Sequence, residues 1–271
     1  MSGRHSPRPF SGIRFAPGDG NHVVSRKHAP VQNDILAALP PENYERVLPA
    51  PEAEPLDLDW MVHGAGDPQS YLHFIAVGII TRMFVTENGE SAGLAVTGTE
   101  GVIGIATFLG GTSTPNQALV TSPGYAYRLK ADLLMHEFDE HFPLRHWLLR
   151  YTQALVSQAG QSAVCNRLHS IEQQLFRWIL SCRDRLPSNE LAMTQELISK
   201  TLSVRREGLT EAAGGLQKAG LIQYRRGKIA VLDRPRMETQ VCECHAVVNR
   251  EYDRLRDAEI ADGKTRVRVH L

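Results

Sequence analysis

Residues 191–232 are the stretch that most constrains how this 271-residue chain can fold. Apolar residues recur there at helical spacing in two blocks, and Ser203 lies at the break between the blocks. Two runs of β-forming residues follow and flank the basic tetrapeptide Arg225-Arg226-Gly227-Lys228. Two helices around a turn, followed by a hairpin with a cationic tip, are typical of a winged helix-turn-helix.

The polar residues of this stretch indicate how it would contact DNA. Thr194 is the predicted N-cap of the first helix, and the second helix is predicted to begin around Arg205. A helix that enters the major groove by its N-terminus presents its first residues to phosphates and base edges. We therefore expect the DNA-binding residues to be Thr194, Ser203, Arg205, Arg206, Glu207, Thr210, Glu211, Arg225, Arg226 and Lys228.

Charge is distributed unevenly along the chain. Overall, 30 Lys and Arg balance 30 Asp and Glu, but residues 183–236 contain 11 basic residues against 6 acidic ones. A local excess of positive charge favours binding to DNA phosphates. The alternative interpretation is a basic face that simply contacts solvent.

The rest of the chain divides by its patterns. Residues 1–30 are rich in proline and glycine and show no period, which predicts a disordered tail. Short β-forming runs and an Asn88-Gly89 turn predict an antiparallel β-roll within residues 31–142. We expect a long helix at 143–170, the winged helix-turn-helix at 171–235, a C-terminal helix at 236–260 and a tail at 261–271. With no secretory signal or long apolar run, a cytoplasmic location is expected.

The predicted long helix carries a continuous stripe at steps of three and four residues. Such a stripe can pack on its own domain, or it can pair with the same helix of a second subunit across a two-fold axis. The stripe consists of Leu144, Leu148, Tyr151, Leu155, Ala159 and Ser162.

The order of roll, long helix and winged helix-turn-helix resembles the Crp-Fnr family of bacterial transcription regulators. The resemblance rests on Glu100-Gly101-Val102-Ile103-Gly104, on the long helix and on MTQELISKTLSVRREGLTEAAGGLQKAGLI, and it covers roughly residues 33–231. It implies an α+β fold with an antiparallel roll like a cyclic-nucleotide-binding jelly roll. It also implies a homodimer formed by the long-helix stripe, a palindromic operator, and four partners: double-stranded DNA, a second copy, RNA polymerase and a small-molecule effector. No membrane is expected as a partner.

The chain departs from the family pattern at the effector site. The family's cyclic-nucleotide cassette contains a Gly-Glu pair and an Arg, and the matching positions here are Gly104-Ile105 and Asn116-Gln117. Residues 101–126 contain no Arg, Lys or His, although a buried phosphate needs strong donors. We therefore expect either an effector other than a cyclic nucleotide, with Gly104, Asn116 and Gln117 at its pocket, or no effector and control by the abundance of the protein.

Other chemistries have less support. No cysteine precedes Cys165, which argues against an N-terminal iron-sulfur cluster, and the roll has too few histidines for a cupin metal centre. Within Cys242-Glu243-Cys244-His245, residues two apart on a helix diverge, so we expect ordinary helix residues, no metal and no cofactor. We expect no catalytic residues and no enzyme activity. The alternative function is a protein-interaction or scaffold module that retains the helix-turn-helix without reading DNA.

Overall fold

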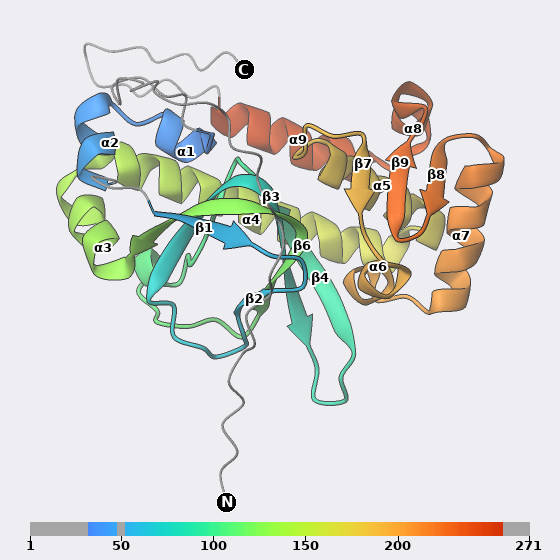
Figure 1. Ribbon diagram of the computed structural model, residues 1–271, viewed down its shortest axis with the longest axis horizontal. Coiled ribbons are helices and arrows are strands. Elements are labelled where there is room, and N and C mark those ends of the chain that lie inside the picture. The colour runs from blue at the N-terminus through green and yellow to red at the C-terminus, as the bar shows by residue number, and fades with distance from the viewer. Residues whose placement is uncertain (1–31, 48–51, 257–271) are drawn as a thin grey trace, which may run out of the picture. The chain divides into compact units, whose positions relative to one another are not determined.

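The computed structural model describes residues 32–47 and 52–256 (Figure 1). These residues all belong to one compact unit that begins at Val31. The tails predicted at 1–30 and 261–271 lie outside the described residues.

An antiparallel β-roll follows two short helices, α1 (Asp34–Ala37) and α2 (Pro41–Val47). Its main path has the strand order β1-β6-β3-β4, with β2 paired to β6 and β5 paired to β3. The roll is therefore antiparallel, as predicted. The strands are β1 (Glu52–Leu56), β2 (Met61–His63), β3 (Tyr71–Val85), β4 (Ser91–Thr97), β5 (Val102–Ile103) and β6 (Gln117–Lys130), with the 3-10 helix η1 (Thr107–Leu109) before β6.

Two β-forming runs of the sequence, 71–77 and 79–85, belong to the single long strand β3. Gly78 joins them with φ of +107°, and the pairing with β6 shifts register on both sides of it. A Cβ at Gly78 would lie 2.7 Å from the carbonyl oxygen of Ser122, so the strand bends there instead of ending. The predicted turn at Asn88-Gly89 is confirmed, since Gly89 has φ of +84° between β3 and β4.

Helices pack against the roll and lead to the C-terminal part of the chain. They are α3 (Ala131–Glu140), α4 (Phe142–Leu168) and α5 (Ile171–Arg183), and Pro143 lies in the first turn of α4, where its missing amide hydrogen is tolerated. A capping box begins α5, because Ser170 accepts a hydrogen bond from the Gln173 amide while the Gln173 side chain accepts one from the Ser170 amide.

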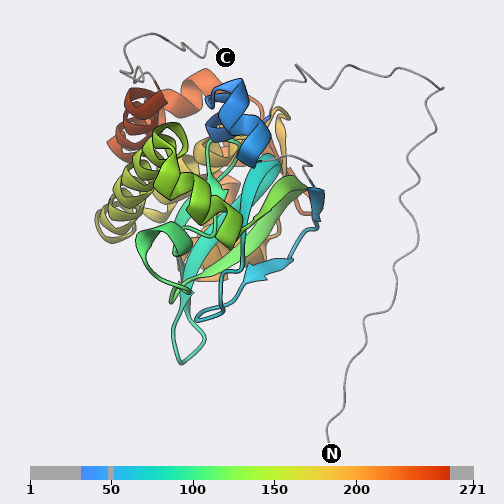
Figure 2. The same ribbon diagram turned by 90° about the vertical axis from the view of Figure 1, so that its left-hand side faces the viewer.

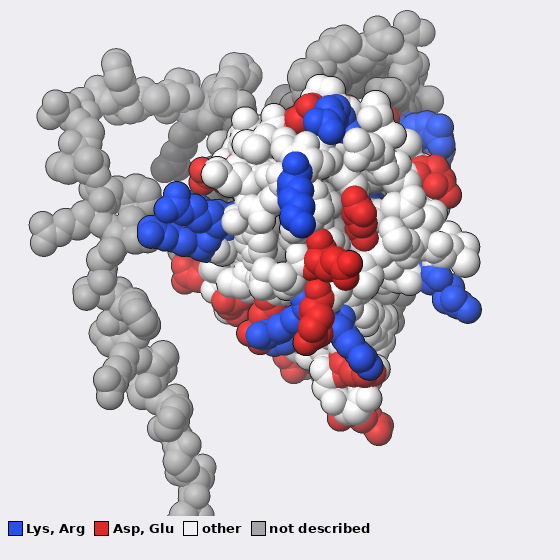
Figure 3. Space-filling view, turned by 90° about the vertical axis from the view of Figure 1, so that its right-hand side faces the viewer, with Lys and Arg blue, Asp and Glu red and all other residues white. Residues whose placement is uncertain are grey.

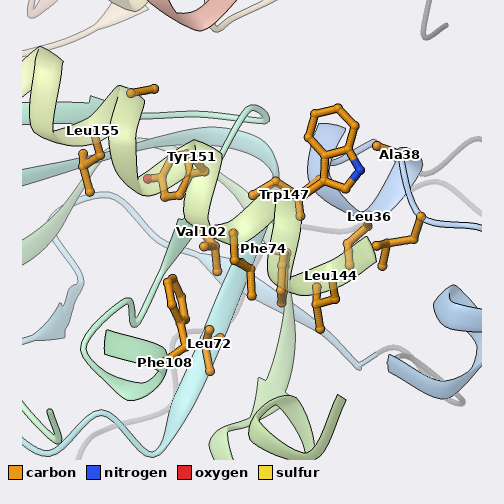
Figure 4. Packing of buried hydrophobic residues seen from close by; sticks show 14 of the residues in the cluster. Leu36, Ala38, Leu72, Phe74, Val102, Phe108, Leu144, Trp147, Tyr151 and Leu155 are labelled. Carbon is orange, nitrogen blue, oxygen red and sulfur yellow. The ribbon is translucent and has the colours of Figure 1, made fainter. Parts of the chain in front are cut away.

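The long-helix stripe is buried inside its own chain (Figure 4). Leu144 and Leu148 are fully buried, and they pack in the same core as Phe74 and Val102 of the roll. Tyr151 donates or accepts hydrogen bonds inside this core. The assignment of Leu144, Leu148, Tyr151, Leu155 and Ser162 to a dimer interface is therefore wrong, because the roll and α9 already cover these side chains; Ala159, also in the stripe, is half-buried.

The C-terminal part is a small helical unit with a three-stranded sheet of order β7-β9-β8. Its elements are β7 (Glu190–Ala192), α6 (Gln195–Leu202), α7 (Arg206–Lys218), β8 (Ile222–Arg225), β9 (Lys228–Val231), α8 (Arg234–Gln240) and α9 (Glu243–Arg256). Figures 1 and 2 show α9 alongside α4. Cys242 precedes α9 instead of lying within it, which corrects the expectation that Cys242 and Cys244 share one helix. None of the described helices is long and apolar enough to span a membrane.

Candidate nucleic-acid interface

The helix-turn-helix is formed by α6 and α7. Thr194 caps α6 as predicted, since its side chain accepts a hydrogen bond from the Leu197 amide at 3.2 Å. Ser203 ends the helix in the left-handed conformation with φ of +57°, which non-glycine residues adopt at a cost. Arg205 occupies the N-cap of α7 without any side-chain capping bond. This start of α7 is thus held by packing more than by capping.

The two faces of α7 differ sharply. Leu209, Ala212, Ala213 and Leu216 are buried against the core of the C-terminal part. Four of the residues expected to bind DNA, by contrast, are exposed on α7 and line one shallow surface groove together with three further residues. The groove residues are Arg206, Glu207, Thr210, Glu211, Gly214, Gly215 and Lys218.

Part of the positive charge at the start of α7 is already paired. Arg206 Nη2 lies 3.0 Å from Glu196 Oε2, and Lys200 Nζ lies 2.9 Å from the other carboxylate oxygen. The hydrogen bond from Lys200, together with the charges of Lys200 and Arg206, lowers the pKa of Glu196. Glu196 is therefore an anion at neutral pH, and it pairs with both of these cations.

The β8–β9 hairpin places the predicted basic tip beside the start of α6. Arg226 and Gly227 form the turn with positive φ, and the Gly227 carbonyl accepts a hydrogen bond from the Met193 amide at 2.7 Å. Tyr224 Oη also donates to the Met193 carbonyl at 3.2 Å. Arg225, Arg226 and Lys228 are exposed, although Lys228 contacts Glu190 at 3.3 Å.

Basic side chains do not form a continuous surface on this side of the molecule. Figure 3 faces the side on which Figure 1 draws α7, and it shows Lys and Arg interspersed with Asp and Glu. Non-specific attraction to DNA is therefore weaker here than for a uniformly basic face. Binding to DNA would therefore depend more on individual side-chain contacts than on the overall charge of this surface.

The predicted effector residues do not form a cationic pocket. Gly104 has φ of +106°, and a Cβ there would lie 2.7 Å from the Tyr71 carbonyl, so it serves chain packing. Asn116 and Gln117 are half-buried at the start of β6. Sequence reasoning missed Gln69, whose side chain accepts from the Ala106 amide at 3.1 Å and donates to Thr114 at 3.2 Å. The Ala106 amide, which directly follows the Gly104-Ile105 position of the family's cassette, is thus hydrogen-bonded by this chain's own glutamine.

Arg82 was also missed, because nothing in the sequence marks it as buried. Its guanidinium lies between the roll and α4, where it donates to Thr97, to Tyr151 Oη at 3.1 Å and to the Val102 carbonyl at 2.6 Å. The Arg82 guanidinium therefore stabilises the packing of the roll against α4.

Direct contacts join the roll to the helix-turn-helix. Ser91 Oγ donates to the Lys200 carbonyl at 3.0 Å, and a Cβ at Gly93 would lie 2.7 Å from the Thr201 carbonyl oxygen. The close approach of β4 to α6 thus requires glycine at this position.

A buried ion pair supplies a second connection between the roll and the C-terminal part. Arg185 Nε lies 2.6 Å from Glu100 Oε1, and both side chains are almost completely buried. Burial alone would lower the pKa of Arg185, but the Glu100 carboxylate raises it above the usual value. Arg185 therefore keeps its positive charge at ordinary pH, beside the Glu100 carboxylate.

Comparison with known proteins identifies the C-terminal part. Residues 173–239 match the family described as the Crp-like helix-turn-helix domain. This segment is a Crp-like helix-turn-helix domain. It contains α6, α7 and the basic hairpin, so the predicted DNA-binding residues all lie within it. No curated protein sequence matches the chain.

Solved structures extend the likeness from the Crp-like helix-turn-helix domain to most of the chain. FixK2 from Bradyrhizobium japonicum has 16% identity and a TM-score of 0.62, over 71% of this chain and 98% of its own. The c-di-GMP responsive global regulator CLP from Xanthomonas campestris has 13% identity and a TM-score of 0.57, over 71% and 99%. A CRP-family transcriptional regulator from Thermus thermophilus has 15% identity and a TM-score of 0.56, over 74% and 96%. The chain therefore has the fold of the Crp/Fnr regulators, which confirms the predicted fold class.

Proposed function

We propose that this chain is a sequence-specific transcription regulator that binds a palindromic DNA operator as a homodimer. The Crp-like helix-turn-helix domain supports the broader function of a DNA-binding transcription regulator. The homodimer, the palindrome and the direct reading of bases are finer proposals, which the exposed faces of α7 and α4 support.

The exposed face of α7 is the observation that carries the proposal. Arg206 and Glu207 lie in the first turn of this helix, where a helix entering the major groove first meets base edges. Arg206 would donate to guanine O6 and N7, and Glu207 would accept from a cytosine amino group. The basic hairpin tip lies beside the same helix-turn-helix and would contact the phosphate backbone.

The homodimer is supported by a second stripe of α4, which is exposed, and not by the buried stripe. Leu149 is 47% exposed and Val156 is 67% exposed, and they are one heptad apart. Gly160 and Ala163 continue this exposed stripe toward the end of the helix. A Cβ at Gly160 would meet no atom within 4 Å, so the chain's own packing does not require glycine there.

A second copy of α4 is the partner that fits this surface. Apolar residues one heptad apart, followed by small residues, suit two closely packed parallel helices. Identical helices across a two-fold axis make a self-complementary contact, and they would place the two α7 helices in successive major grooves about 34–36 Å apart. Contact with RNA polymerase stays a prediction of the family resemblance.

Regulation by an effector would act through the contacts between the roll and α6. The Ser91 and Gly93 contacts and the Glu100–Arg185 pair tie the position of the helix-turn-helix to the roll. A ligand that binds one arrangement of these contacts more tightly than another would shift the DNA-binding population. The described residues give no support to a cyclic nucleotide as that ligand.

Selection of bound sequences from random DNA by the purified full chain, followed by affinity measurements on the selected operator, tests direct reading. We expect Arg206→Ala to weaken binding to that operator by about 10- to 100-fold, or roughly 1–3 kcal/mol, and to relax preference at one base pair in each half-site. Lys130→Ala at the exposed end of β6 removes one positive charge outside both α7 and the exposed stripe of α4, and it should leave operator affinity unchanged.

The competing function, a scaffold that does not read DNA, predicts a different result. In that case selection would enrich no sequence, and Arg206→Ala would change neither affinity nor preference. That outcome would contradict the proposed function.

A further inference from the structure

A cluster of three cysteines and a histidine lies at the base of the Crp-like helix-turn-helix domain, away from the proposed DNA interface. Cys165 and His169 are four residues apart at the end of α4, and Cys242 and Cys244 lie at the junction of α8 and α9. Their ligand atoms all lie within 4.8 Å of one another. Among the described residues, this is the group with the composition and geometry of a metal site.

The distances within the cluster match tetrahedral coordination. Cys165 Sγ and Cys242 Sγ are 3.8 Å apart, and Cys244 Sγ lies 3.4 Å from His169 Nδ1. Zinc bonds of about 2.3 Å to sulfur and about 2.0 Å to nitrogen, at tetrahedral angles, separate two sulfurs by roughly 3.8 Å and sulfur from nitrogen by roughly 3.5 Å. The side chains are thus already spaced for one ion.

Neighbouring side chains support the same interpretation. His169 Nε2 lies 3.5 Å from Glu243 Oε1, so the carboxylate orients the ring with Nδ1 toward the cysteines. Gln161 Nε2 donates to Cys244 Sγ at 3.1 Å. Thiolate ligands commonly receive such N–H donors, which stabilise their negative charge.

Arg177 completes the charge balance. It is buried at 7% exposure, and its guanidinium donates to Cys165 Sγ at 3.2 Å and to Ser162 Oγ at 3.3 Å. No carboxylate of the described residues forms an ion pair with it. A divalent ion with three thiolates and a neutral imidazole carries one net negative charge, and this charge would pair with the buried guanidinium.

We propose that Cys165, His169, Cys242 and Cys244 bind one structural zinc ion. Thiolate and imidazole ligands in a tetrahedral set select zinc among the common divalent ions, and four protein ligands leave no open position for a catalytic water. The sequence had predicted no metal at Cys242-Glu243-Cys244-His245. In the structure His245 instead contacts Asp184 at 2.8 Å, and α4 supplies the missing two ligands.

The position of the site indicates what the ion does. Cys165 and His169 precede residues 173–239, and Cys242 and Cys244 follow them, so the four ligands bracket the Crp-like helix-turn-helix domain. Cys165 and Cys242 are 77 positions apart. An ion that joins them closes this long loop and fixes the domain to the end of α4, which stabilises the fold by restricting the unfolded chain.

Metal analysis of the full-length chain, purified under reducing conditions, tests the proposal. We expect about one zinc per chain, and replacement with Co²⁺ should give the charge-transfer and d–d absorption bands of tetrahedral thiolate coordination. Removal of zinc by a chelator should lower Tm by on the order of 10 °C, and zinc alone should restore it. None of these measurements involves DNA, so they stand apart from the test of the proposed function.

Variants and a matched control make the result specific. Cys165→Ser and His169→Gln should each weaken zinc affinity by more than about 100-fold, because loss of a direct ligand costs more than loss of its outer partner. Cys182→Ala removes the fourth cysteine, which is buried in α5 outside the cluster, and should keep one zinc.

Several results would overturn the site. A wild-type chain that binds no zinc after incubation with the metal would do so, as would a Co²⁺ complex that lacks thiolate bands. Zinc loss in Cys182→Ala equal to that in Cys165→Ser and His169→Gln would also contradict the proposed ligands. The cobalt spectrum of the wild type decides the question even if a ligand variant fails to fold.

Discussion

Glu196 determines how much positive charge at the start of α7 is available to DNA in the free protein. Its carboxylate is exposed and pairs with both Arg206 and Lys200. Binding to a phosphate or a base must first break these pairs. We therefore expect this residue of α6 to lower the affinity of α7 for DNA.

Replacing this carboxylate should strengthen DNA binding. We expect Glu196→Gln to tighten binding to any duplex by about two- to five-fold and to steepen the salt dependence, because two freed cations meet the phosphates. Fluorescence anisotropy across a range of salt concentrations measures both effects. Glu238→Gln is the matched control, since Glu238 pairs with Arg234 at 2.7 Å on α8, outside the interface. Equal tightening by both variants would show a general charge effect and contradict the specific one.

The hydrogen-bonding roles of some residues could be predicted from the sequence, and those of others could not, for a physical reason. Thr194 and Ser170 were predictable because a cap bonds to amides only a few positions away. Gln69 and Arg82 act across 37 and 69 positions, where they meet Ala106 and Tyr151. No local pattern signals partners at that separation.

The long helix α4 shows how periodicity can predict an element and still leave its faces unassigned. Both the buried stripe through Leu148 and the exposed stripe through Val156 follow steps of three and four residues. Which of them faces the chain's own core depends on where the roll and α9 pack. That information is absent from the helix sequence.

A charge on the exposed stripe should break the dimer without unfolding the protomer. Val156 is 67% exposed, so Val156→Glu should change the free energy of unfolding of the protomer by less than about 0.5 kcal/mol. Across a two-fold axis the two carboxylates would face each other, and we expect the dimer Kd to rise at least about 10-fold. Analytical ultracentrifugation measures this Kd.

Leu133→Glu provides the control for the dimer experiment. Leu133 is 55% exposed on α3, outside the stripe, and its replacement should leave the dimer intact. A wild-type chain that stays monomeric at micromolar concentration, or a dimer unaffected by Val156→Glu, would show that this stripe of α4 is not the interface.

For the molecule as a whole, two buried histidines of the roll make the stability of the fold depend on pH. Burial lowers the pKa of His63 and of His73, even though His73 lies 2.8 Å from Glu54. His63 Nε2 faces the Gln69 amide nitrogen at 3.3 Å, and Nδ1 faces the Gly64 carbonyl at 3.2 Å. The neutral ring with its proton on Nδ1 satisfies both contacts.

Stability should therefore fall as the pH drops below about 6.5, the pKa of histidine in an unfolded chain. Below that pH the unfolded chain binds protons that the folded chain does not bind, so the free energy of unfolding decreases. We expect a loss of up to about 1.4 kcal/mol for each of the two histidines between pH 7.5 and 5.5. Urea unfolding across this range measures it.

The His63→Gln variant isolates one histidine from all other titrating groups. Glutamine can keep both polar contacts but cannot be protonated. The free energy of unfolding of this variant should therefore fall less between pH 7.5 and 5.5 than that of the wild type, by the amount that His63 contributes. Identical pH profiles for the two proteins would show that His63 is charged equally in the folded and unfolded chains.

The sequence alone determined the helix-turn-helix, the caps at Thr194 and Ser170, the antiparallel roll and which polar residues lie on the exposed face of α7. Each of these depends on periodicity, turn residues or caps within a few positions of one another. Tertiary structure decided which stripe of α4 is buried, how Gln69 and Arg82 are used, and that Cys165 and His169 meet Cys242 and Cys244. These outcomes depend on how distant segments pack, and packing energy is shared among many contacts that no short stretch of sequence contains.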